Sequence, residues 1–487
     1  MSAVMSATMS WSTLLDGLAR PRAEVVINDL CLDSRQVGPG ALFVAVQGGT
    51  GHGAEYIQAA VVAGAVAVIH DGGCPIDADV AVPMLAVPEL KRHLATLARR
   101  LWPEVAELDL VAVTGTNGKT SVAWLLAQAL DGAMLGTLGI GRPGKHHAGT
   151  HTTPDLFSVY RELAGLKRSG IERVVLEASS HALDQGRLKG LDFSCVIFTG
   201  LGHDHLDYHR DLAAYFEAKA RLFTEFASER QIINLDNESG RQLAGRLDGN
   251  AGLIGYTLGD QPAATARLEP LRIDLSGLAA RLHVDGRSID LESILLGRIN
   301  LHNLTIVALE LDARGQAPAE IAERIAGLRP VPGRMQVLHD REGRVAVIDY
   351  AHTPDALENV LISLRELGAE RVWCVFGCGG ERDQDKRPRM GRIAESLADQ
   401  VILTDDNPRG EDGTAIIRAI QAGQRRPERS RVIRDRETAI MTALTESGRG
   451  DLVLIAGKGH ETEQVIGDQR LPFSDEAVVR RWMQEAA

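Results

Sequence analysis

Short apolar runs of strand length alternate with longer stretches of helical period along most of the chain. Runs of about four to eight apolar residues bounded by polar residues or glycines predict strands, and apolar positions that recur every three or four residues predict amphipathic helices. Near the N-terminus the pattern predicts strands at 41–46 and 66–70, with a helix at 56–63 between them. We expect this stretch to form a small α/β domain.

The same alternation continues through the middle and the last part of the chain. In the middle, the predicted elements are strands at 110–113, 174–176 and 195–198 and helices at 121–130 and 213–227. In the last part, they are strands at 345–348, 372–376, 401–403 and 452–455 and helices at 358–367 and 414–422. Strands that alternate with helices in this way form doubly wound parallel sheets. The pattern therefore predicts such a sheet in the middle and a Rossmann-like α/β fold in the last part.

Two proline-containing segments separate these parts. Trp102-Pro103 precedes the first central strand, and residues 329–333 read Arg-Pro-Val-Pro-Gly. Proline restricts the backbone and interrupts regular elements, so both segments are suitable linkers. We expect an α/β protein of three domains. The expected domains are 1–105, 106–331 and 332–487.

Composition and charge narrow the class of protein. The chain has 487 residues, 44% of them hydrophobic, which suffices for several packed cores. Its net charge of −12 leaves no basic surface for nucleic acid. Residues 1–10 carry no Lys or Arg, and the strongest apolar run, 59–69, is far shorter than the roughly 20 residues of a membrane span. We expect a cytoplasmic protein with no nucleic-acid partner and no membrane span.

The five cysteines do not form the even set that a disulfide framework requires. Cys374 and Cys378 are four residues apart, but no second Cys or His pair lies at metal-ligand spacing. We expect reduced thiols in the core.

The most informative segment joins an apolar strand to a helix through a glycine-rich turn. Residues 111–121 read Val-Ala-Val-Thr-Gly-Thr-Asn-Gly-Lys-Thr-Ser. Such a turn binds phosphates through its backbone N–H groups, Lys119 can reach the β- and γ-phosphates, and the hydroxyl of Thr120 or Ser121 can bind Mg²⁺. The generic phosphate-loop pattern has a glycine where this chain has Val113, so the match fails at one position. The residues that we expect to bind ATP are Gly115, Thr116, Asn117, Gly118, Lys119, Thr120 and Ser121.

Polar groups also follow two other predicted strands. Glu177 comes directly after the strand at 174–176, and the run His-Asp-His-Leu-Asp-Tyr-His at 203–209 follows the strand at 195–198. Ligands of open α/β sheets bind beyond the carboxyl ends of strands, so Glu177 can bind Mg²⁺ there. A solvated glutamate in a loop would have the same sequence pattern. Three histidines and two aspartates in seven residues indicate metal or phosphate chemistry, and their spacing does not choose between the two.

In their order along the chain, these segments resemble the motifs of the Mur ligases of bacterial cell-wall synthesis. The resemblance continues with 300–303 (Asn-Leu-His-Asn), 332–334 (Pro-Gly-Arg) and 349–354 (Asp-Tyr-Ala-His-Thr-Pro). It covers essentially the whole chain and implies an ATP-dependent ligase. The further residues that it assigns to the nucleotide are Asn300, Asn303, Arg334 and Asp349. Folylpolyglutamate synthases of the wider superfamily share the phosphate loop and some of these motifs, so the substrate depends on other residues.

Other segments resemble the branch of the family that adds the third amino acid to UDP-N-acetylmuramoyl-L-alanyl-D-glutamate. They are 32–35 (Leu-Asp-Ser-Arg), 151–154 (His-Thr-Thr-Pro) and 177–187. By this resemblance, the residues that contact the UDP precursor are Leu32, Ser34, Thr152, Thr153, Ser179, Gln185 and Arg187. Hydroxyls and a guanidinium suit its phosphate, carboxylate and amide groups. Taken alone, 152–154 would be a turn or the start of a helix.

The identity of the third amino acid is indicated by residues 406–409. They read Asp-Asn-Pro-Arg, which looks like the motif of the meso-diaminopimelate-adding ligases, whereas lysine-adding relatives usually lack the arginine. A guanidinium binds a carboxylate bidentately, so Arg409 would favour the distal carboxylate of diaminopimelate and repel the cationic end of lysine. Without the resemblance, residues 406–409 would be interpreted as a plain turn before a helix, which does not explain the arginine. The residues that the resemblance assigns to the amino-acid pocket are Arg382, Asp406, Asn407, Pro408, Arg409, Gly457 and Glu461.

The resemblance also implies the reaction and the metal. ATP would convert the D-glutamyl carboxylate into an acyl phosphate, which the amine of meso-diaminopimelate then attacks. Lys219 matches the family's carbamylated lysine, although from the sequence alone it would be an ordinary lysine on a helix surface. The implied catalytic residues are Lys119, Glu177, His205 and Lys219, and the implied Mg²⁺ ligands are Thr120, Glu177, His205 and carbamylated Lys219. We expect a monomer.

Two positions depart from the family pattern, and two other functions stay open. His203 replaces a residue that is commonly basic or polar in the family. The family usually has Thr-Asn-Leu before the acidic run, where residues 199–201 of this chain read Thr-Gly-Leu. The alternative enzyme is a lysine-adding or polyglutamylating ligase. Arg409, together with the segments that contain Ser34 and Thr152-Thr153, argues against both. The non-enzymatic alternative is a phosphate-loop module that uses nucleotide binding as a switch for a protein partner. In such a module Glu177, His205 and Lys219 would have no joint purpose.

Overall fold

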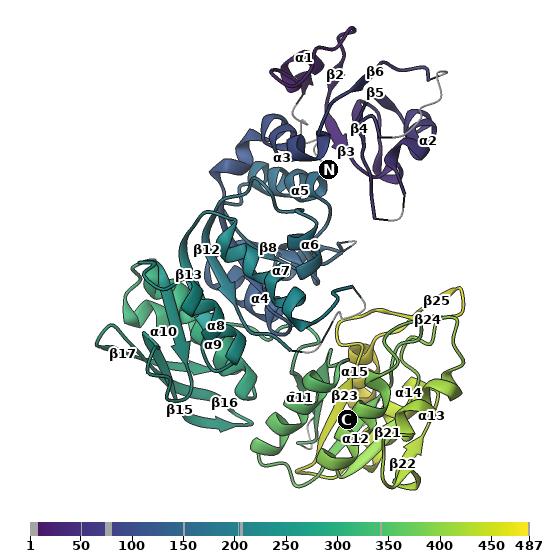
Figure 1. The fold of residues 1–487 in the computed structure, drawn as a ribbon. Helices are drawn as coiled ribbons and strands as arrows, with labels where there is room; N and C mark the ends of the chain where they lie inside the picture. Colours follow the sequence, from purple (N-terminus) through teal and green to yellow (C-terminus); the bar gives the residue numbers. More distant parts are fainter. Residues whose placement is uncertain are drawn as a thin grey trace. The chain divides into compact units, whose positions relative to one another are not determined.

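The structure is a computed structural model that describes residues 8–49, 51–73, 80–149, 151–202, 204, 208–340 and 343–485. It divides into two compact units. Figure 1 labels the helices and strands of the chain. One unit comprises Met1–Thr114, Leu130–Val196 and Glu217–Arg230, and the other comprises Gly115–Ala129, Ile197–Phe216 and Gln231–Ala487. Each unit is thus built from stretches that lie far apart in the sequence.

A four-stranded parallel sheet lies in the N-terminal part. Its strands, in spatial order, are β3 (Asp29–Cys31), β4 (Ala41–Ala45), β5 (Ala65–His70) and β6 (Met84–Ala86). The pair β1 (Met9–Ser10) and β2 (Val26–Ile27) and the helix α1 (Trp11–Leu14) are separate from it. The helix α2 (Ile57–Val62) connects β4 to β5 and packs on a small core that includes Phe43 and Val68. The two strands and the helix predicted here are confirmed, and the helix is preceded by the 3₁₀ turn η2 (Gly53–Tyr56).

An eleven-stranded mixed sheet forms the middle part, in the order β10-β9-β8-β11-β7-β12-β13-β14-β15-β16-β17. The bounds are β7 (Asp109–Thr114), β8 (Ala133–Gly136), β9 (Gly139–Arg142), β10 (Lys145–His147), β11 (Arg173–Glu177), β12 (Phe193–Phe198), β13 (Ser228–Asn234), β14 (Leu253–Thr257), β15 (Ala266–Asp274), β16 (Gly277–Val284) and β17 (Arg287–Ser293). Strands β8, β11 and β7 are parallel, as are β13, β14 and β15, whereas both ends of the sheet are antiparallel. Glu177 pairs with Val113, so β7 and β11 end level with each other and the segments after them start at the same edge.

The other helices before residue 330 precede β7, lie between the strands or follow β17. They are α3 (Leu90–Leu101), α4 (Lys119–Ala129), α5 (Leu156–Arg168), α6 (Ser180–Asp184), α7 (Leu212–Thr224), α8 (Glu238–Arg246), α9 (Arg298–Ala313) and α10 (Pro318–Ala326), with the 3₁₀ turn η3 (Pro103–Glu107) before β7. The prediction of a helix at 213–227 extends this helix three residues too far. The helix ends at Thr224, because the carbonyl of Ala227 accepts a hydrogen bond from the backbone of Phe193 in β12 (3.0 Å).

The prediction missed the antiparallel strands β15, β16 and β17. Exposed and buried positions alternate along much of these strands. A strand with one solvated face carries no continuous apolar run, so the search for such runs passed over it.

A six-stranded sheet forms the C-terminal part, in the order β18-β19-β23-β20-β21-β22. The bounds are β18 (Gln336–His339), β19 (Val345–Asp349), β20 (Val372–Phe376), β21 (Gln400–Leu403), β22 (Ser430–Val432) and β23 (Leu452–Ala456), and a hairpin of β24 (Glu463–Ile466) and β25 (Gln469–Pro472) follows. The helices are α11 (Pro354–Glu366), α12 (Lys386–Leu397), α13 (Gly413–Gln421), α14 (Arg436–Glu446) and α15 (Asp475–Glu485), with the 3₁₀ turn η4 (Pro427–Arg429). Strand β18 is antiparallel to its neighbour β19, and the other described neighbours in this sheet are parallel.

Both faces of this sheet are covered, as in a doubly wound fold. Leu357 of α11, Met390 of α12 and Ile416 of α13 belong to one core, whereas Ile440 of α14 and Val479 of α15 belong to the core on the other face. The helix predicted from 358 begins four residues earlier at Pro354. Its N-cap is Thr353, and proline is favoured at the first helical position.

Cys374 and Cys378 are buried in the first of these cores. Burial raises the pKa of both thiols to about 12, so they stay protonated near neutral pH. This agrees with the expectation of reduced core thiols.

Candidate active site

The glycine-rich loop before α4 has the backbone shape of a phosphate-binding turn. Gly115 has a φ of +149° and Gly118 a φ of +87°, values that other residues rarely adopt. A Cβ on Gly115 would also overlap the Oγ1 of Thr199. Lys119 is the first residue of α4, and its Nζ donates to the carbonyls of Gly115 and Thr116 at 2.8 Å each. The loop therefore ends at a helix N-terminus, where backbone N–H groups and Lys119 suit an anion.

The segment after β12 holds this loop. Thr199 Oγ1 donates to the carbonyl of Asn117 (2.5 Å), and the backbone N–H of Thr116 donates to the carbonyl of Gly200 (2.9 Å). Gly200, which stands where the family usually has asparagine, has a φ of +136°. This position therefore supports the loop through its backbone, in a conformation that disfavours a side chain.

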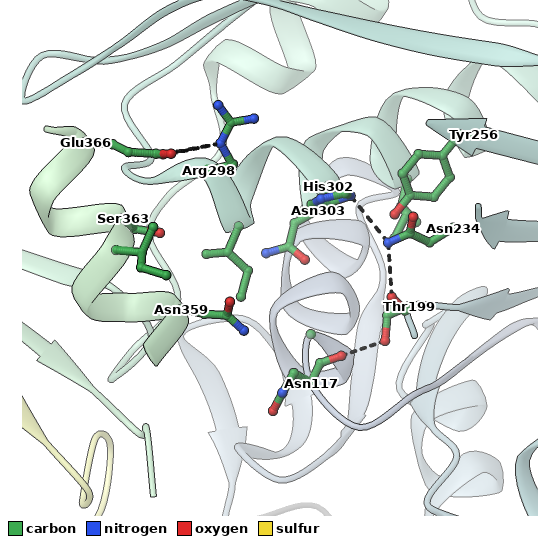
Figure 2. A pocket seen from close by; sticks show the side chains of 14 residues that line it. Asn117, Thr199, Asn234, Tyr256, Arg298, His302, Asn303, Asn359, Ser363 and Glu366 are labelled. Atoms are coloured by element: carbon green, nitrogen blue, oxygen red, sulfur yellow. Dashed lines mark hydrogen bonds and ion pairs between the residues drawn. The ribbon is translucent and has the colours of Figure 1, made fainter. Parts of the chain in front are cut away.

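A cavity of about 250 Å³ opens beside the loop (Figure 2). Asn117 and Gly118 of the loop line it, together with residues of β13, β14, α9 and α11. Three of the lining side chains are apolar: Ile299 and Ile306 on α9 and Ile362 on α11. A slot with isoleucines on its walls, next to a phosphate-binding turn, suits a flat base attached to phosphates.

Of the two predicted asparagines of α9, Asn303 lines this cavity and Asn300 supports it. The Nδ2 of Asn303 donates to the Oδ1 of Asn300 (2.8 Å), and the Nδ2 of Asn300 donates to the carbonyl of Leu296 (2.8 Å). Asn300 thus orients Asn303.

The polar end of the cavity contains residues that the sequence reasoning did not assign. Figure 2 shows the amide of Asn234 between Thr199 and His302, and its Nδ2 lies 3.3 Å from the Thr199 carbonyl oxygen and 3.4 Å from His302 Nδ1. Burial lowers the pKa of His302, against the opposing charge of Asp236, so this ring is neutral near pH 7. Asn234 is the last residue of β13, and its position at the carboxyl end of a strand is the signal that could have found it.

Tyr256 of β14 also lines this end of the cavity and carried no signal in the sequence. Its side chain is fully buried, and among the described residues its hydroxyl has no hydrogen-bond partner. Burial raises the pKa of this hydroxyl, so it stays protonated and can donate to a ligand.

Glu177 is fully buried at the end of β11, so the solvated-loop alternative is wrong. Its carboxylate accepts hydrogen bonds from the backbone N–H (2.8 Å) and hydroxyl (3.1 Å) of Thr137. The Thr137 hydroxyl lies 3.0 Å from that of Thr152. A Cβ on Gly136 would overlap Glu177, so glycine makes room for the carboxylate.

Four of the residues assigned to the UDP precursor meet beside Glu177. The hydroxyl of Thr153 donates to the Glu177 carbonyl (2.6 Å) and accepts from the backbone N–H of Ser179 (3.2 Å). Arg187 donates to the carbonyl of Thr153 (2.6 Å) and twice to the Oε1 of Gln185 (2.7 and 3.0 Å). The structure therefore brings 152–153 and 179–187 together.

Leu32 and Ser34 lie in the N-terminal part, and Ser34 is the first residue of the 3₁₀ turn η1 (Ser34–Gln36). This turn is tied to α5, because Gln36 Oε1 accepts a hydrogen bond from the Ser158 hydroxyl (3.0 Å). Arg161 of α5 also binds Asp29 (2.9 Å) near the start of the same segment. Sequence reasoning did not find these contacts, since their partners lie more than a hundred positions apart.

The residues assigned to the amino-acid pocket form a second cluster, at the carboxyl ends of β21 and β23. Asn407 donates from Nδ2 to Glu461 Oε2 (2.9 Å). A Cβ on Gly457, whose φ is +114°, would lie 2.5 Å from Asp406 Oδ2. Arg409 donates from Nη1 to the Gly380 carbonyl (2.7 Å). The structure thus brings 406–409 and 457–461 together.

The remaining two members of the assigned pocket lie at its rim and in its wall. Arg382 is exposed and follows Gly379-Gly380, and a Cβ on Gly379 would lie 3.0 Å from Arg409 Nη1 and 3.7 Å from Arg382 Cγ. Pro408 is buried, and its carbonyl accepts from the backbone N–H of Glu411 (3.0 Å). Arg382 is therefore close to Arg409, and Pro408 shapes the turn that presents it.

Arg334 and Asp349 also lie in the C-terminal part, close to each other. The carboxylate of Asp349 accepts from the backbone N–H groups of Met335 (2.7 Å) and Ala351 (2.8 Å). Burial raises the pKa of Asp349, and the charge of Arg334 opposes the shift. The Arg334 guanidinium lies 4.2 Å above the ring of Tyr350. Asp349 thus holds the turn that carries Arg334.

The predicted Mg²⁺ ligands are only partly placed. Lys219 on α7 is 1% exposed, so it is not an ordinary surface lysine. Thr120 and Ser121 are buried on the first turn of α4, in the other unit from Glu177 and Lys219. His205 lies outside the described residues, as does His203. Within the described ranges no three His, Cys, Asp or Glu side chains cluster as a metal site, and the joint metal set stays a prediction.

Among the described helices, none is both long and apolar enough to cross a membrane.

Comparison with known proteins shows which protein family the chain is similar to. Three family models match it: "Mur ligase family, catalytic domain" over residues 26–102, "Mur ligase middle domain" over 113–310 and "Mur ligase, glutamate ligase domain" over 333–459. Proteins named UDP-N-acetylmuramoyl-L-alanyl-D-glutamate--2,6-diaminopimelate ligase are similar over nearly the full length. That of Alkalilimnicola ehrlichii is 47% identical over 96% of both chains, and that of Xanthomonas campestris is 44% identical over 97% of both.

Solved structures of ligases are also similar to this chain over nearly its full length. A structure of a protein with the same name is 34% identical, covers 98% of this chain and 99% of its own, and has a TM-score of 0.68. The MurF ligase of Thermotoga maritima in complex with ADP covers 94% of this chain and 96% of its own, with a TM-score of 0.64. At 19% identity it shows likeness of fold alone.

Fold and site together define an α/β nucleotide-binding protein with a phosphate loop. The chain belongs to the Mur ligase family, and it is an ATP-dependent, amide-forming ligase. The predicted fold class is confirmed, since the chain has the three-domain α/β architecture of that family. Membership in a family of ligases also argues against the nucleotide-switch module.

Proposed function

We propose that this ligase joins meso-2,6-diaminopimelate to the D-glutamyl carboxylate of UDP-N-acetylmuramoyl-L-alanyl-D-glutamate, in the synthesis of peptidoglycan precursors. The observation that carries the proposal is the cluster of Asp406, Asn407, Arg409, Gly457 and Glu461, which offers charged groups of both signs in one pocket. The names of relatives at 42–47% identity point to the same substrates.

In this proposal Arg409 and Glu461 select the amino acid. Arg409 uses one N–H group on the Gly380 carbonyl, and its remaining N–H groups are suited to the distal carboxylate of diaminopimelate. Glu461 suits the distal ammonium. Arg382, at the rim, adds a second guanidinium for a carboxylate. A diamino acid with two carboxylates matches this set better than lysine does.

ATP is assigned to the loop at 115–121 and the cavity beside it. Lys119 and the N-terminus of α4 bind phosphates, the isoleucine walls take the base, and Asn303 lies between them. Arg334 and Asp349 complete the nucleotide site from the C-terminal part.

Mg²⁺ is assigned to Thr120, Glu177, His205 and carbamylated Lys219. Burial of Glu177 and Lys219 supports this set, because neither side chain lies on the surface, and carbamylation would turn Lys219 into an oxygen ligand for the metal. Bound Mg²⁺ neutralises phosphate charge and polarises the group that is transferred.

The UDP precursor is assigned to Leu32, Ser34, Thr152, Thr153, Ser179, Gln185 and Arg187. Hydrogen bonds already hold the last five of these near Glu177, so the D-glutamyl end of the precursor would lie at the edge where β11 ends. We retain the expectation of a monomer that acts in the cytoplasm.

The reaction then proceeds in two steps. An oxygen of the D-glutamyl carboxylate takes the γ-phosphoryl group of ATP, and ADP leaves. The free amine of diaminopimelate attacks the carbonyl carbon, the tetrahedral intermediate expels phosphate, and the amine loses its proton. Lys119 stabilises the charge that develops on the transferred group, and the two substrate pockets supply orientation.

The proposal is tested by phosphate release with ATP, Mg²⁺ and the UDP precursor, with meso-diaminopimelate or L-lysine as the only further addition. We expect turnover with diaminopimelate alone. Turnover with lysine would indicate the lysine-adding alternative and overturn the role of Arg409. Turnover with neither, but with glutamate and a folate acceptor, would indicate a folylpolyglutamate-type ligase.

A further inference from the structure

Lys458 is a fully buried lysine in the acceptor pocket. It lies between Gly457 and Gly459, and its side chain is 0% exposed. Its Nζ donates to Asn407 Oδ1 (3.0 Å), Glu461 Oε2 (2.8 Å) and the carbonyl of Glu463 (2.7 Å). All three N–H groups of the ammonium are thus used, which is the condition for burying such a charge without a large cost.

These contacts fix the two residues that face the amino acid. Asn407 Oδ1 accepts from Lys458 and from the backbone N–H of Val465 (2.9 Å), and Asn407 Nδ2 donates to Glu461 Oε2 (2.9 Å). Glu461 Oε2 therefore accepts twice, while no hydrogen bond of the described residues uses Oε1. The carboxylate is held by one oxygen, and the other is available to a ligand.

Lys458 also sets the charge of the pocket. Lys458, Arg409 and Arg382 are positive, and Asp406 and Glu461 are negative, so these five groups sum to +1. meso-Diaminopimelate carries two ammonium and two carboxylate groups and is neutral near pH 7, whereas lysine carries a net positive charge. Without Lys458 this sum would fall to zero, and the pocket would repel the cationic lysine less.

We infer that Lys458 is a positioning residue that orients Asn407 and Glu461 and, through its charge, sets the preference for a neutral diamino diacid over lysine. The inference rests on the proposed function. Arg436 provides a contrast: it is equally buried and donates to the carbonyl of Ala456 (3.0 Å) next to Gly457, but its charged partner is Asp475.

The test compares Lys458→Met and Lys458→Gln with the wild type, with diaminopimelate or lysine as acceptor. We expect Lys458→Met to raise the KM for diaminopimelate about ten-fold or more, with the KM for ATP and for the UDP precursor within about two-fold. The ratio of kcat/KM for diaminopimelate to that for lysine should fall about five-fold in both variants, because both lack the charge. Lys458→Gln keeps a donor, so its KM should rise less.

The possible outcomes distinguish a failure of this inference from a failure of the proposed function. The double variant Arg436→Met/Asp475→Leu is the matched control: it removes a buried ion pair without changing the net charge near the pocket, so it should lower stability without changing the acceptor ratio. If both Lys458 variants keep the wild-type ratio, or all three KM values rise together, Lys458 only supports the fold and the inference is wrong. Where Lys458→Met does not fold, a Lys458→Gln variant with the wild-type ratio is sufficient to overturn the inference. A wild type without diaminopimelate-dependent turnover would overturn the proposed function, and this inference with it.

Discussion

Gly457 shows how little space the acceptor pocket leaves at a single residue. Its φ of +114° disfavours any side chain, and a Cβ there would lie 2.5 Å from Asp406 Oδ2. Lys458, the next residue, is buried in the same pocket. The sequence resemblance identified Gly457, but no local feature of the sequence distinguishes Lys458 from an exposed lysine, because its burial depends on 407 and 461.

Gly457→Ala should weaken binding of the amino acid. Because the new methyl group would displace Asp406, we expect the KM for diaminopimelate to rise about ten-fold, with little change for ATP. Gly368→Ala is the control, since Gly368 has a φ of +82° and nothing within 4 Å of its Cβ position. Steady-state kinetics of both variants measures the effect. An equal rise in the control would attribute it to backbone strain and not to Asp406.

Lys119→Ala should abolish turnover and leave the UDP precursor bound. The Lys119 ammonium lies within the phosphate loop, where its loss removes charge stabilisation of the transferred group, so we expect kcat to fall about a thousand-fold. Calorimetry should give a Kd for the UDP precursor within about two-fold of the wild type. Lys91→Ala, at an exposed position on α3, should change neither. An unchanged kcat would refute the phosphate-loop assignment.

At the scale of elements, a buried ion pair joins α14 and α15 beneath the acceptor pocket. Arg436 binds Asp475 through two hydrogen bonds of 2.8 Å, and both side chains are 0% exposed. Arg436 also binds the last carbonyl of β23, at Ala456. The helices themselves follow from local apolar periodicity, whereas this pairing joins residues 39 positions apart.

Arg436→Met should destabilise the protein by about 3–5 kcal/mol, because Asp475 would be left as an unpaired buried charge. The double variant Arg436→Met/Asp475→Leu should recover much of this loss, since neither charge remains. Arg480→Met removes an exposed pair with Glu476 and should cost less than about 1 kcal/mol. Urea denaturation measures all three. A single variant as stable as Arg480→Met would show that the pair contributes little.

At the scale of the whole molecule, two partly buried histidines link stability to pH. Burial lowers the pKa of His352, with a further contribution from Lys386, and burial lowers the pKa of His302. The unfolded chain therefore binds more protons than the folded chain below the unfolded pKa of about 6.5. The stability that these groups contribute is present above that pH and is lost as the pH falls.

The thermal midpoint should therefore fall between pH 7.5 and pH 5.5, by roughly 2–4 °C for each kcal/mol lost. His352→Asn should show a smaller fall, because asparagine can still donate to the carbonyl of Tyr350, as His352 does over 2.8 Å, but does not titrate. His283→Asn, at a half-exposed histidine on β16, is the control and should show the same fall as the wild type. A steeper pH dependence in His352→Asn would contradict the sign of the argument.

The sequence by itself determined the order of strands and helices, the phosphate loop, Glu177 and the segment 406–409. Periodicity, turn chemistry and family motifs are local properties, so they can be read without coordinates. Only the tertiary structure decided that Asn407 meets Glu461, that Lys458 and Tyr256 are buried, and that α7 ends at Thr224. These features depend on which distant elements pack together, because burial and non-local hydrogen bonds arise only when the chain has folded.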